Sequence, residues 1–478
     1  MNTTCIRLAN PQEGARVFAI IVIGVFLTLA PGTLWGQTGS ALPEQIDLET
    51  AVALALQSNL GIESEMLEVR QKKLIADTWW NRFYPQASAS VTMGRLNEQP
   101  SPSPVAILLQ QQTGGPPPED PPRWFMSGQL NFSLDLTLQT FPGISLSRLD
   151  YEMGLLTLAE ARNQVERDVG KQFYNLLLTA EQIALMEQRI ASAERRYEQA
   201  QVNFANGLID EFSLLSAQVA VENQRPALQA MQGGYQQQLL VFRNTLGLPL
   251  RTQIVPVGTI DPPAVDREVL ETAMFQNRLD LQQLRLLEQI RKEQIRVNDF
   301  SPGGRYPFLR FGLTVDPRFE GDPLQDSWFD RERWNQQSGA FTITLVQPLT
   351  AWFPYSQQRN EITGLEREIE RNRLNMEQAI RGAEIRVEGL LLGIENSQRT
   401  MVALTENIHL ARRAFELAEV GYNNGLRELL EVQNAEIELR DAELQLLQEQ
   451  KNVMDNLLDL IFELNVSMDE VTAGRQGN

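Results

Sequence analysis

The stretch IALMEQRIASAERRYEQAQVNFANGL at residues 183–208 has a counterpart 218 positions later, MVALTENIHLARRAFELAEVGYNNGL at residues 401–426. In both, the apolar residues alternate at spacings of three and four, which is the seam of a coiled coil. The matched pairs are Ile183 and Met401, Met186 and Leu404, Ile190 and Ile408, Ala193 and Ala411, Tyr197 and Phe415, Ala200 and Ala418, and Phe204 and Tyr422. Each seam ends in Asn-Gly-Leu, at Asn206, Gly207 and Leu208 and again at Asn424, Gly425 and Leu426. These endings predict the tight turns of two helical hairpins.

The correspondence extends over residues 47–247 and 266–465 in their helical parts. We therefore divide the chain into a first repeat at 37–255, with its turn at 206–208, a second at 256–466, with its turn at 424–426, and a tail at 467–478. A helix over 143–204 would be about 90 Å long, which no compact domain needs. Leu444 stands at the position of the second repeat that is equivalent to Pro226, so a kink is expected in the first repeat alone.

Residues 1–36 have the pattern of a secretory signal peptide, with Arg7 and Arg16 ahead of an apolar run at 17–30. That run is too short to span a bilayer as a helix, and no later stretch approaches the required length. The single cysteine, Cys5, precedes the run, so neither disulfides nor lipidation are indicated. Removing residues 1–36, with two arginines and one glutamate, changes the net charge from −19 to −20, which argues against a nucleic-acid partner.

Each repeat also carries two strand patterns between its helices. In the clearest, apolar residues from Leu130 to Leu138 alternate with polar ones from Asn131 to Gln139. The others are 87–93, 309–315 and 341–345, close to the length of a tilted membrane strand. The alternation predicts that Leu134 and Leu136 face lipid and that Asp135 faces water.

The six tryptophans beyond residue 36 flank these strands. Trp79, Trp80 and Trp352 lie at the ends next to the helices, and Trp124, Trp328 and Trp334 lie at the ends next to the loops. Aromatic rings at both ends are typical of two membrane interfaces. Four strands cannot close a barrel, and an open edge is not tolerated in lipid. Several subunits should therefore share one barrel, and a conducting pore needs at least three.

The tandem layout resembles the TolC-like outer-membrane efflux proteins over essentially the whole chain after residue 36. The likeness is carried by Ala55-Leu56 with Asn59, Tyr84-Pro85, Gln347-Pro348-Leu349, and Tyr422-Asn423-Asn424-Gly425 with Ala435. It implies an α+β membrane protein that forms a homotrimer, with a twelve-stranded barrel among outer-membrane lipids and a helical tunnel in the periplasm. It also implies a periplasmic adaptor and an inner-membrane pump as partners, in efflux or type I secretion, with the two turns docking the adaptor.

The same resemblance implies a gate at the second turn. Tyr422 and Arg427 would hold the tunnel closed, and Glu431 would form an acidic constriction. The second acid of the family pattern is absent, because Asn434 stands there, and Ser213 replaces the acid expected after the first turn. Asp210 or Glu211 would then accept Arg427.

Two other classes of protein, an enzyme and a periplasmic adaptor or scaffold, fit the sequence less well. An enzyme is not indicated, because there is no nucleophile, phosphate or metal motif, and the single histidine, His409, follows a seam residue. No catalytic residue, cofactor or metal is therefore expected. A periplasmic coiled-coil adaptor or scaffold would share the hairpins, but it would not need alternating strands bracketed by tryptophan.

Overall fold

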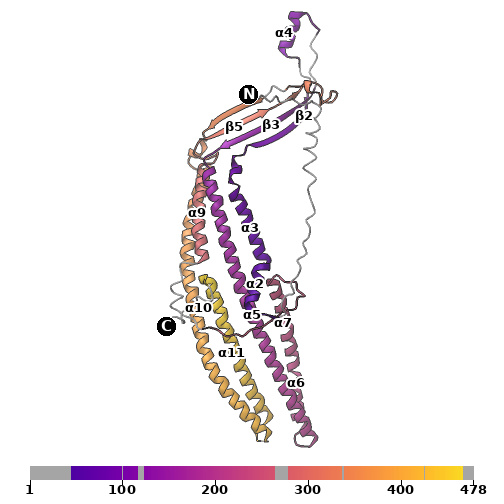
Figure 1. Ribbon diagram of the computed structural model, residues 1–478, viewed down its shortest axis with the longest axis vertical. Helices are drawn as coiled ribbons and strands as arrows, with labels where there is room; N and C mark the ends of the chain where they lie inside the picture. Colours follow the sequence, from indigo (N-terminus) through magenta and orange to yellow (C-terminus); the bar gives the residue numbers. More distant parts are fainter. Residues whose placement is uncertain are drawn as a thin grey trace, which may run out of the picture. The chain divides into compact units, whose positions relative to one another are not determined.

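The computed structural model describes residues 45–98, 101–116, 123–263, 278–335, 339–424 and 426–466, without the side chains of Ala106 and Asn423. These residues belong to one unit, Gln45–Asn478, in which long helices run from a sheet to two hairpin turns (Figure 1). The signal peptide predicted at 1–36, the tail at 467–478 and Gly425 lie outside the described residues. Among the described helices, none has the length and apolarity of a membrane span.

Two long helices, α5 (Thr140–Ala205) and α10 (Gln357–Asn423), run from the sheet to the turns. At 66 residues, α5 is about 100 Å long. The returning helix of the second repeat is the single helix α11 (Leu429–Leu464), whereas the first repeat has α6 (Glu211–Glu222) and α7 (Gln224–Thr245).

The interruption between α6 and α7 lies at Asn223, three residues before Pro226. Proline has no N–H to donate to the carbonyl of Glu222, four residues earlier, and its ring crowds that carbonyl. Asn223 keeps helical dihedrals, so the helix is interrupted rather than reversed.

Shorter helices complete each repeat on the sheet side. In the first repeat these are α2 (Leu48–Ser58), α3 (Leu60–Asp77) and the 3-10 helix η2 (Trp79–Phe83), and in the second α9 (Leu279–Asp299). Asn59 separates α2 from α3, and its side chain caps α3 by accepting from Gly61 N and Ile62 N. Its amide also donates to the carbonyl of Thr245 at 2.8 Å, tying α3 to the end of α7.

The sheet consists of four long antiparallel strands, β2 (Gln86–Arg95), β3 (Trp124–Leu136), β5 (Phe308–Val315) and β8 (Gly339–Val346), in that order. The pairs β2–β3 and β5–β8 come from separate repeats and join at β3–β5, where Asp135 is opposite Arg310. Short β6 (Arg318–Phe319) and β7 (Trp334–Asn335) pair with each other, and β6 also pairs with β3 at Ser127. The 3-10 helices η3 (Arg331–Arg333) and η4 (Thr350–Trp352) flank β7 and β8. All four expected strands are present, and β2, β5 and β8 are extended by at most two residues at either end. The exception is β3, which begins six residues before Leu130 and ends at Leu136, so Leu138, expected in the strand, lies beyond it.

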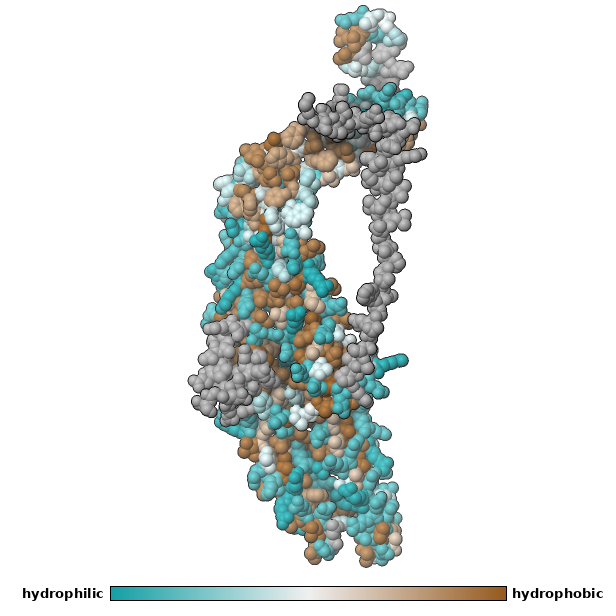
Figure 2. All heavy atoms as spheres, viewed as in Figure 1, coloured by the Kyte–Doolittle hydropathy of each residue, from teal (hydrophilic) through white to brown (hydrophobic). Residues whose placement is uncertain are grey.

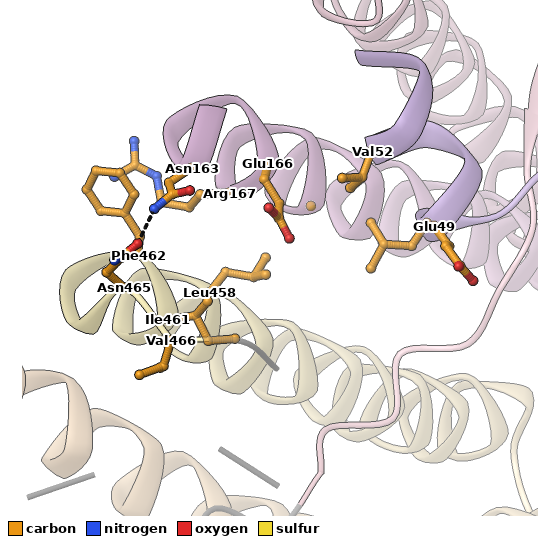
Figure 3. Close-up of a pocket in the computed structure, with 12 residues that line it drawn as sticks. Glu49, Val52, Asn163, Glu166, Arg167, Leu458, Ile461, Phe462, Asn465 and Val466 are labelled. Atoms are coloured by element: carbon orange, nitrogen blue, oxygen red, sulfur yellow. Dashed lines mark hydrogen bonds between the residues drawn. The ribbon is translucent and has the colours of Figure 1, made fainter. Parts of the chain in front are cut away.

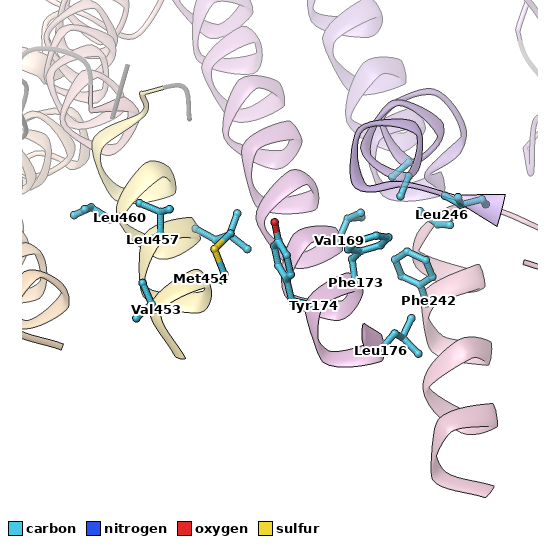
Figure 4. Close-up of a cluster of buried hydrophobic side chains, with 14 of the residues drawn as sticks. Val169, Phe173, Tyr174, Leu176, Phe242, Leu246, Val453, Met454, Leu457 and Leu460 are labelled. Carbon is cyan, nitrogen blue, oxygen red and sulfur yellow. The ribbon is translucent and has the colours of Figure 1, made fainter. Parts of the chain in front are cut away.

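The core lies where the helices of both repeats meet (Figure 4). Its members keep the offset of 218, which confirms the repeat inferred from the sequence: Val169 and Val387, Phe173 and Leu391, Leu176 and Ile394, Leu239 and Leu457, Phe242 and Leu460, and Leu246 and Leu464. The two-residue strands β1 (Gln45–Ile46) and β4 (Val255–Pro256) pair in parallel beside it. Burying matched apolar residues from both repeats in one cluster joins the two hairpins into a single unit.

The connection between β2 and β3 is partly helical in its described residues. It contains a helix, α4 (Pro104–Thr113), with Pro104 in the first helical position, where its missing N–H costs nothing. Val105, Leu108 and Leu109 of this helix are exposed.

Candidate functional site

The sheet has one apolar and one polar face, set by the period of two along each strand. Register aligns Leu134 with Phe311 and Ile343, and the next apolar row is Leu136, Leu309 and Leu345. The apolar side chains are exposed on this chain, with Ile343 at 59% and Leu345 at 70%. Hydrophobic residues gather over the sheet, whereas the helices show a mixed surface (Figure 2). Leu134 and Leu136 therefore share the apolar face, as expected, and Asp135 lies on the opposite one.

The six flanking tryptophans lie at strand ends. Trp79 and Trp80 begin η2 just before β2, and Trp352 ends η4 just after β8. At the other end Trp124 begins β3, and Trp334 begins β7, where its indole N–H donates to the carbonyl of Trp328 at 2.9 Å. The structure thus gathers the tryptophans at the two ends of one sheet.

The two hairpin turns share one backbone hydrogen bond. After α5, Leu208 N donates to Asn203 O at 2.8 Å and Gly207 N to Phe204 O at 2.9 Å, with Gly207 at φ +71°. This pattern is the Schellman motif, which needs a left-handed residue after the helix. After α10, Leu426 N donates to Gly421 O at 2.8 Å, the equivalent bond. Leu208 and Leu426 are 71% and 81% exposed, so each turn presents an apolar side chain.

Arg427 and Glu431, which the sequence assigned to separate parts of a gate, contact each other. The Arg427 guanidinium lies 2.7 Å from the Glu431 carboxylate, one helical turn away, and both side chains are about half exposed. Tyr422 is half-buried. A Cβ on Gly421 would lie 2.9 Å from Cγ of Arg427, so this glycine leaves room for the arginine stem.

Asp210 has a local role at the first turn. Its carboxylate caps α6 by accepting from Ser213 N at 2.9 Å. Hydrogen bonding from the side chain and the backbone N–H of Ser213 lowers the pKa of Asp210 below its usual range. Ser213, the residue that departs from the family pattern, is thus the partner of Asp210, while Glu211 is an exposed residue in the first turn of α6.

Sequence reasoning missed a buried ion pair between the repeats. Arg196 of α5 donates to Glu436 of α11, and their side chains are only 14% and 4% exposed. The equivalent of Glu436 in the first repeat is Gln218, so the offset does not reveal the pair. A signal was present, because Val432, Glu436 and Leu439 are spaced by four and three and share one helix face.

A cavity of about 680 Å³ lies between α2, α5 and the end of α11 (Figure 3). Asn163 donates to Asn465 Oδ1 at 2.5 Å, and the Arg167 guanidinium lies 4.2 Å from the centre of the Phe462 ring. Glu49 and Glu166 also line the cavity. These contacts join the end of α11, in the second repeat, to the interior of α5, in the first. Across the described ranges, no group of three or more histidine, cysteine, aspartate or glutamate residues has the geometry of a metal site.

A sequence profile described as "Outer membrane efflux protein" matches residues 53–248 and 272–465. Its two segments coincide with the two repeats. This chain belongs to the outer membrane efflux protein family. It is accordingly an outer-membrane protein whose helical part lies in the periplasm, and the family is one of channels. A search of curated proteins finds no match.

Solved structures of similar fold support the assignment. The outer-membrane protein VceC of Vibrio cholerae is 16% identical, with a TM-score of 0.66 over 88% of this chain and 96% of that chain. The CmeC outer-membrane channel of Campylobacter jejuni is 15% identical, with a TM-score of 0.67 over 87% and 85% of the two chains. The MtrE outer-membrane channel of Neisseria gonorrhoeae is 16% identical, with a TM-score of 0.63 over 89% and 90%. These likenesses confirm the expected fold class.

Proposed function

We propose that three copies of this chain form a duct that exports solutes or polypeptides across the outer membrane, working with a periplasmic adaptor and an inner-membrane pump. The observation that carries this proposal is the sheet, which has an exposed apolar face and two unpaired edges. Within the described residues, β2 has β3 as its single neighbour and β8 has β5. Unpaired backbone groups are not tolerated in hydrocarbon, so β2 of one copy must pair with β8 of the next.

The helices present the same two edges. On the sheet side α3 packs against α5, α5 against α9, and α9 against α10, so α3 and α10 are the outer helices. The edge strand β2 follows α3 in the chain, and the edge strand β8 precedes α10. Each outer helix therefore lies on the same side of the molecule as the edge strand next to it in sequence. A head-to-tail contact between these edges generates a ring when its rotation closes.

Both edge helices expose apolar residues, at different levels along their length. On α3, Leu60, Leu67 and Leu74 are 75%, 56% and 63% exposed at a spacing of seven residues. On α10, Ile385 and Leu392 are 74% and 46% exposed at the same spacing. A seven-residue repeat is the pattern of helices that pack side by side.

The number of copies follows from the bore that transport needs. Two copies would supply eight long strands, and a barrel of eight is filled by its own side chains. Three copies supply twelve, the count that the family resemblance implies. The exposed leucines at the tips, Leu208 and Leu426, then lie at the duct's periplasmic end, where the resemblance places the adaptor.

The alternative, a periplasmic adaptor or scaffold, accounts for the hairpins but not for the sheet. A soluble scaffold would expose the apolar rows of β3, β5 and β8 to water, and such patches mark interaction or membrane surfaces. We therefore favour the channel.

The decisive experiment compares arginine at neighbouring positions of β3. Leu130 is the central residue of the 13-residue strand and lies on the apolar face, while Asn131 lies on the polar face. We expect Leu130→Arg to impair assembly by about 2 to 4 kcal/mol, the cost of arginine at the bilayer midplane. Leu134 lies two residues from the end of β3, so arginine there should cost less. Asn131→Arg is the matched control and should assemble normally.

The readout is a heat-resistant oligomer in outer-membrane fractions, together with conductance in planar bilayers. A wild-type protein that fractionates as a soluble periplasmic monomer would contradict the proposal. Tolerance of Leu130→Arg with loss of assembly in Asn131→Arg would reverse the assignment of the two faces.

A further inference from the structure

The polar face of the sheet carries almost no charge. Of all residues in β2, β3, β5 and β8, three are charged, namely Arg95, Asp135 and Arg310. Arg95 ends β2 on the apolar side, in register with Trp124. The polar face is otherwise mainly hydroxyl, amide, glycine and alanine residues: Gln86, Ser88, Ser90, Thr92, Ser127, Gln129, Asn131, Ser133, Gly312, Thr314, Ala340, Thr342 and Thr344. Charge on this face of the four strands is thus confined to one aspartate and one arginine.

Those two residues neutralise each other. Arg310 Nε lies 2.7 Å from Asp135 Oδ1, and a terminal guanidinium nitrogen lies 2.8 Å from Oδ2. The two hydrogen bonds run in parallel, the geometry in which arginine holds a carboxylate most firmly. The residues are directly opposite in register, one on each strand of the β3–β5 junction. Both side chains keep access to solvent, at 33% for Asp135 and 50% for Arg310.

We propose that Asp135 and Arg310 determine the ion selectivity of the barrel, by keeping its water-facing wall neutral. This inference rests on the proposed function, in which the polar face lines the lumen. A ring of three copies places three such pairs at one level, next to the helix-side end of β3. With both partners present, cations and anions meet a wall without net charge there. Loss of either partner leaves three like charges at that level.

Because of this pair, the charge balance of the strands differs from that of the rest of the chain. The chain is acidic, with a net charge of −19, and a duct lined in proportion would favour cations along its whole length. The strands depart from that balance, because each carboxylate on the polar face is matched by a guanidinium. Any cation preference of the wild-type duct must then arise among the helices.

The experiment measures reversal potentials of the assembled full-length protein in planar bilayers under a gradient of potassium chloride. We expect Asp135→Asn, which leaves Arg310 unpaired, to shift permeability toward chloride. Arg310→Gln should shift it toward potassium, each by about twofold or more, since charged rings in a narrow pore concentrate counterions. The double variant Asp135→Asn with Arg310→Gln should return to the wild-type value.

Two further variants test this assignment. Arg95→Gln removes the same charge from the other face and should leave the reversal potential unchanged. The exchange Asp135→Arg with Arg310→Asp keeps the pair and should also match wild type. Conducting channels in which the two single variants show no shift, or a shift of the same sign, would overturn the proposal. So would loss of assembly in both single variants with normal assembly of the exchange, because the pair would then be a strand clamp. Failure of the wild type to form channels would instead contradict the proposed function.

Discussion

Glu436 places a carboxylate on the buried side of α11, where Arg196 of the other repeat is its single ion-pair partner among the residues that the structure describes. Charges removed from water are costly unless paired, so removing one partner of such a pair costs about 3 to 5 kcal/mol. We expect Glu436→Gln to lower the free energy of unfolding by roughly 3 kcal/mol, near the lower limit because Arg196 keeps some exposure. The measurement is denaturant unfolding followed by circular dichroism.

Two variants separate the buried charge from a general loss of contacts. Arg412 pairs with Glu443 at 3.0 Å but is 60% exposed, so Arg412→Gln should cost less than about 1 kcal/mol. Arg196→Met with Glu436→Leu should recover most of the stability, since an apolar pair fills the same space without a buried charge. Equal losses in Glu436→Gln and Arg412→Gln would show that burial of the pair has no special weight.

Among the elements, the first hairpin turn depends on one glycine, Gly207. A Cβ on Gly207 would meet no atom within 4 Å, so a substitution there acts through the backbone at φ +71°. A side chain in that conformation costs about 1 to 2 kcal/mol, and asparagine tolerates it best. We expect Gly207→Val to reduce crosslinking of the first turn to the adaptor and to lower transport. Gly207→Asn is the control and should retain most of both. Unchanged crosslinking in Gly207→Val would argue against docking at this turn.

The stability of the first turn of α6 should depend on pH. Hydrogen bonding from Ser213 lowers the pKa of Asp210 in the folded chain. The stabilisation by this cap is therefore present above the unfolded pKa, about 3.9, and is lost as pH falls through the lower folded value. Hydrogen exchange over the first turn of α6 should lose protection in that acidic range. Asp210→Asn caps without titrating and should stay protected. Parallel behaviour of the two proteins would contradict the assignment.

The elements show what the sequence could and could not predict. The seams, three of the four strands and the first turn follow from the sequence to within a few residues, because each has a local period or a turn glycine. The start of β3 does not, because residues 124–129 lack the alternation that marks the rest of the strand. The α6–α7 interruption was placed three residues late, at Pro226 rather than Asn223, because proline disrupts the turn before it. The contacts of Arg196 with Glu436, and of Arg310 with Asp135, cross between repeats, and no offset within the sequence encodes them. The resemblance implies a partner for Arg427 in the first hairpin, whereas the contact observed is with Glu431, four residues later in the first turn of α11.

At the scale of the whole molecule, the repeats join their helix ends by different chemistry at equivalent places. In the first repeat Asn59 hydrogen-bonds to Thr245, and 218 positions later Glu463 replaces Thr245. The Glu463 carboxylate lies 3.3 Å from Arg278 and 2.9 Å from Arg386. A neutral cap in one copy thus corresponds to an ionic cluster in the other. The duplication fixes the architecture, while the pairs that differ between copies make the hairpins unequal.

That inequality bears on the predicted gate, because Tyr422, Arg427 and Glu431 belong to the second hairpin, whereas Asp210 and Glu211 belong to the first. We expect Arg427→Ser with Tyr422→Phe to raise single-channel conductance in planar bilayers, since fewer hydrogen bonds would hold the second hairpin closed. Glu431→Gln removes the carboxylate that Arg427 contacts at 2.7 Å but leaves the arginine and tyrosine in place. Its resting conductance should therefore stay near wild type, while cation selectivity and block by divalent cations fall, because three carboxylates no longer converge on one ion. Unchanged conductance in the double variant would rule out the latch, and undiminished divalent block in Glu431→Gln would rule out the acidic ring.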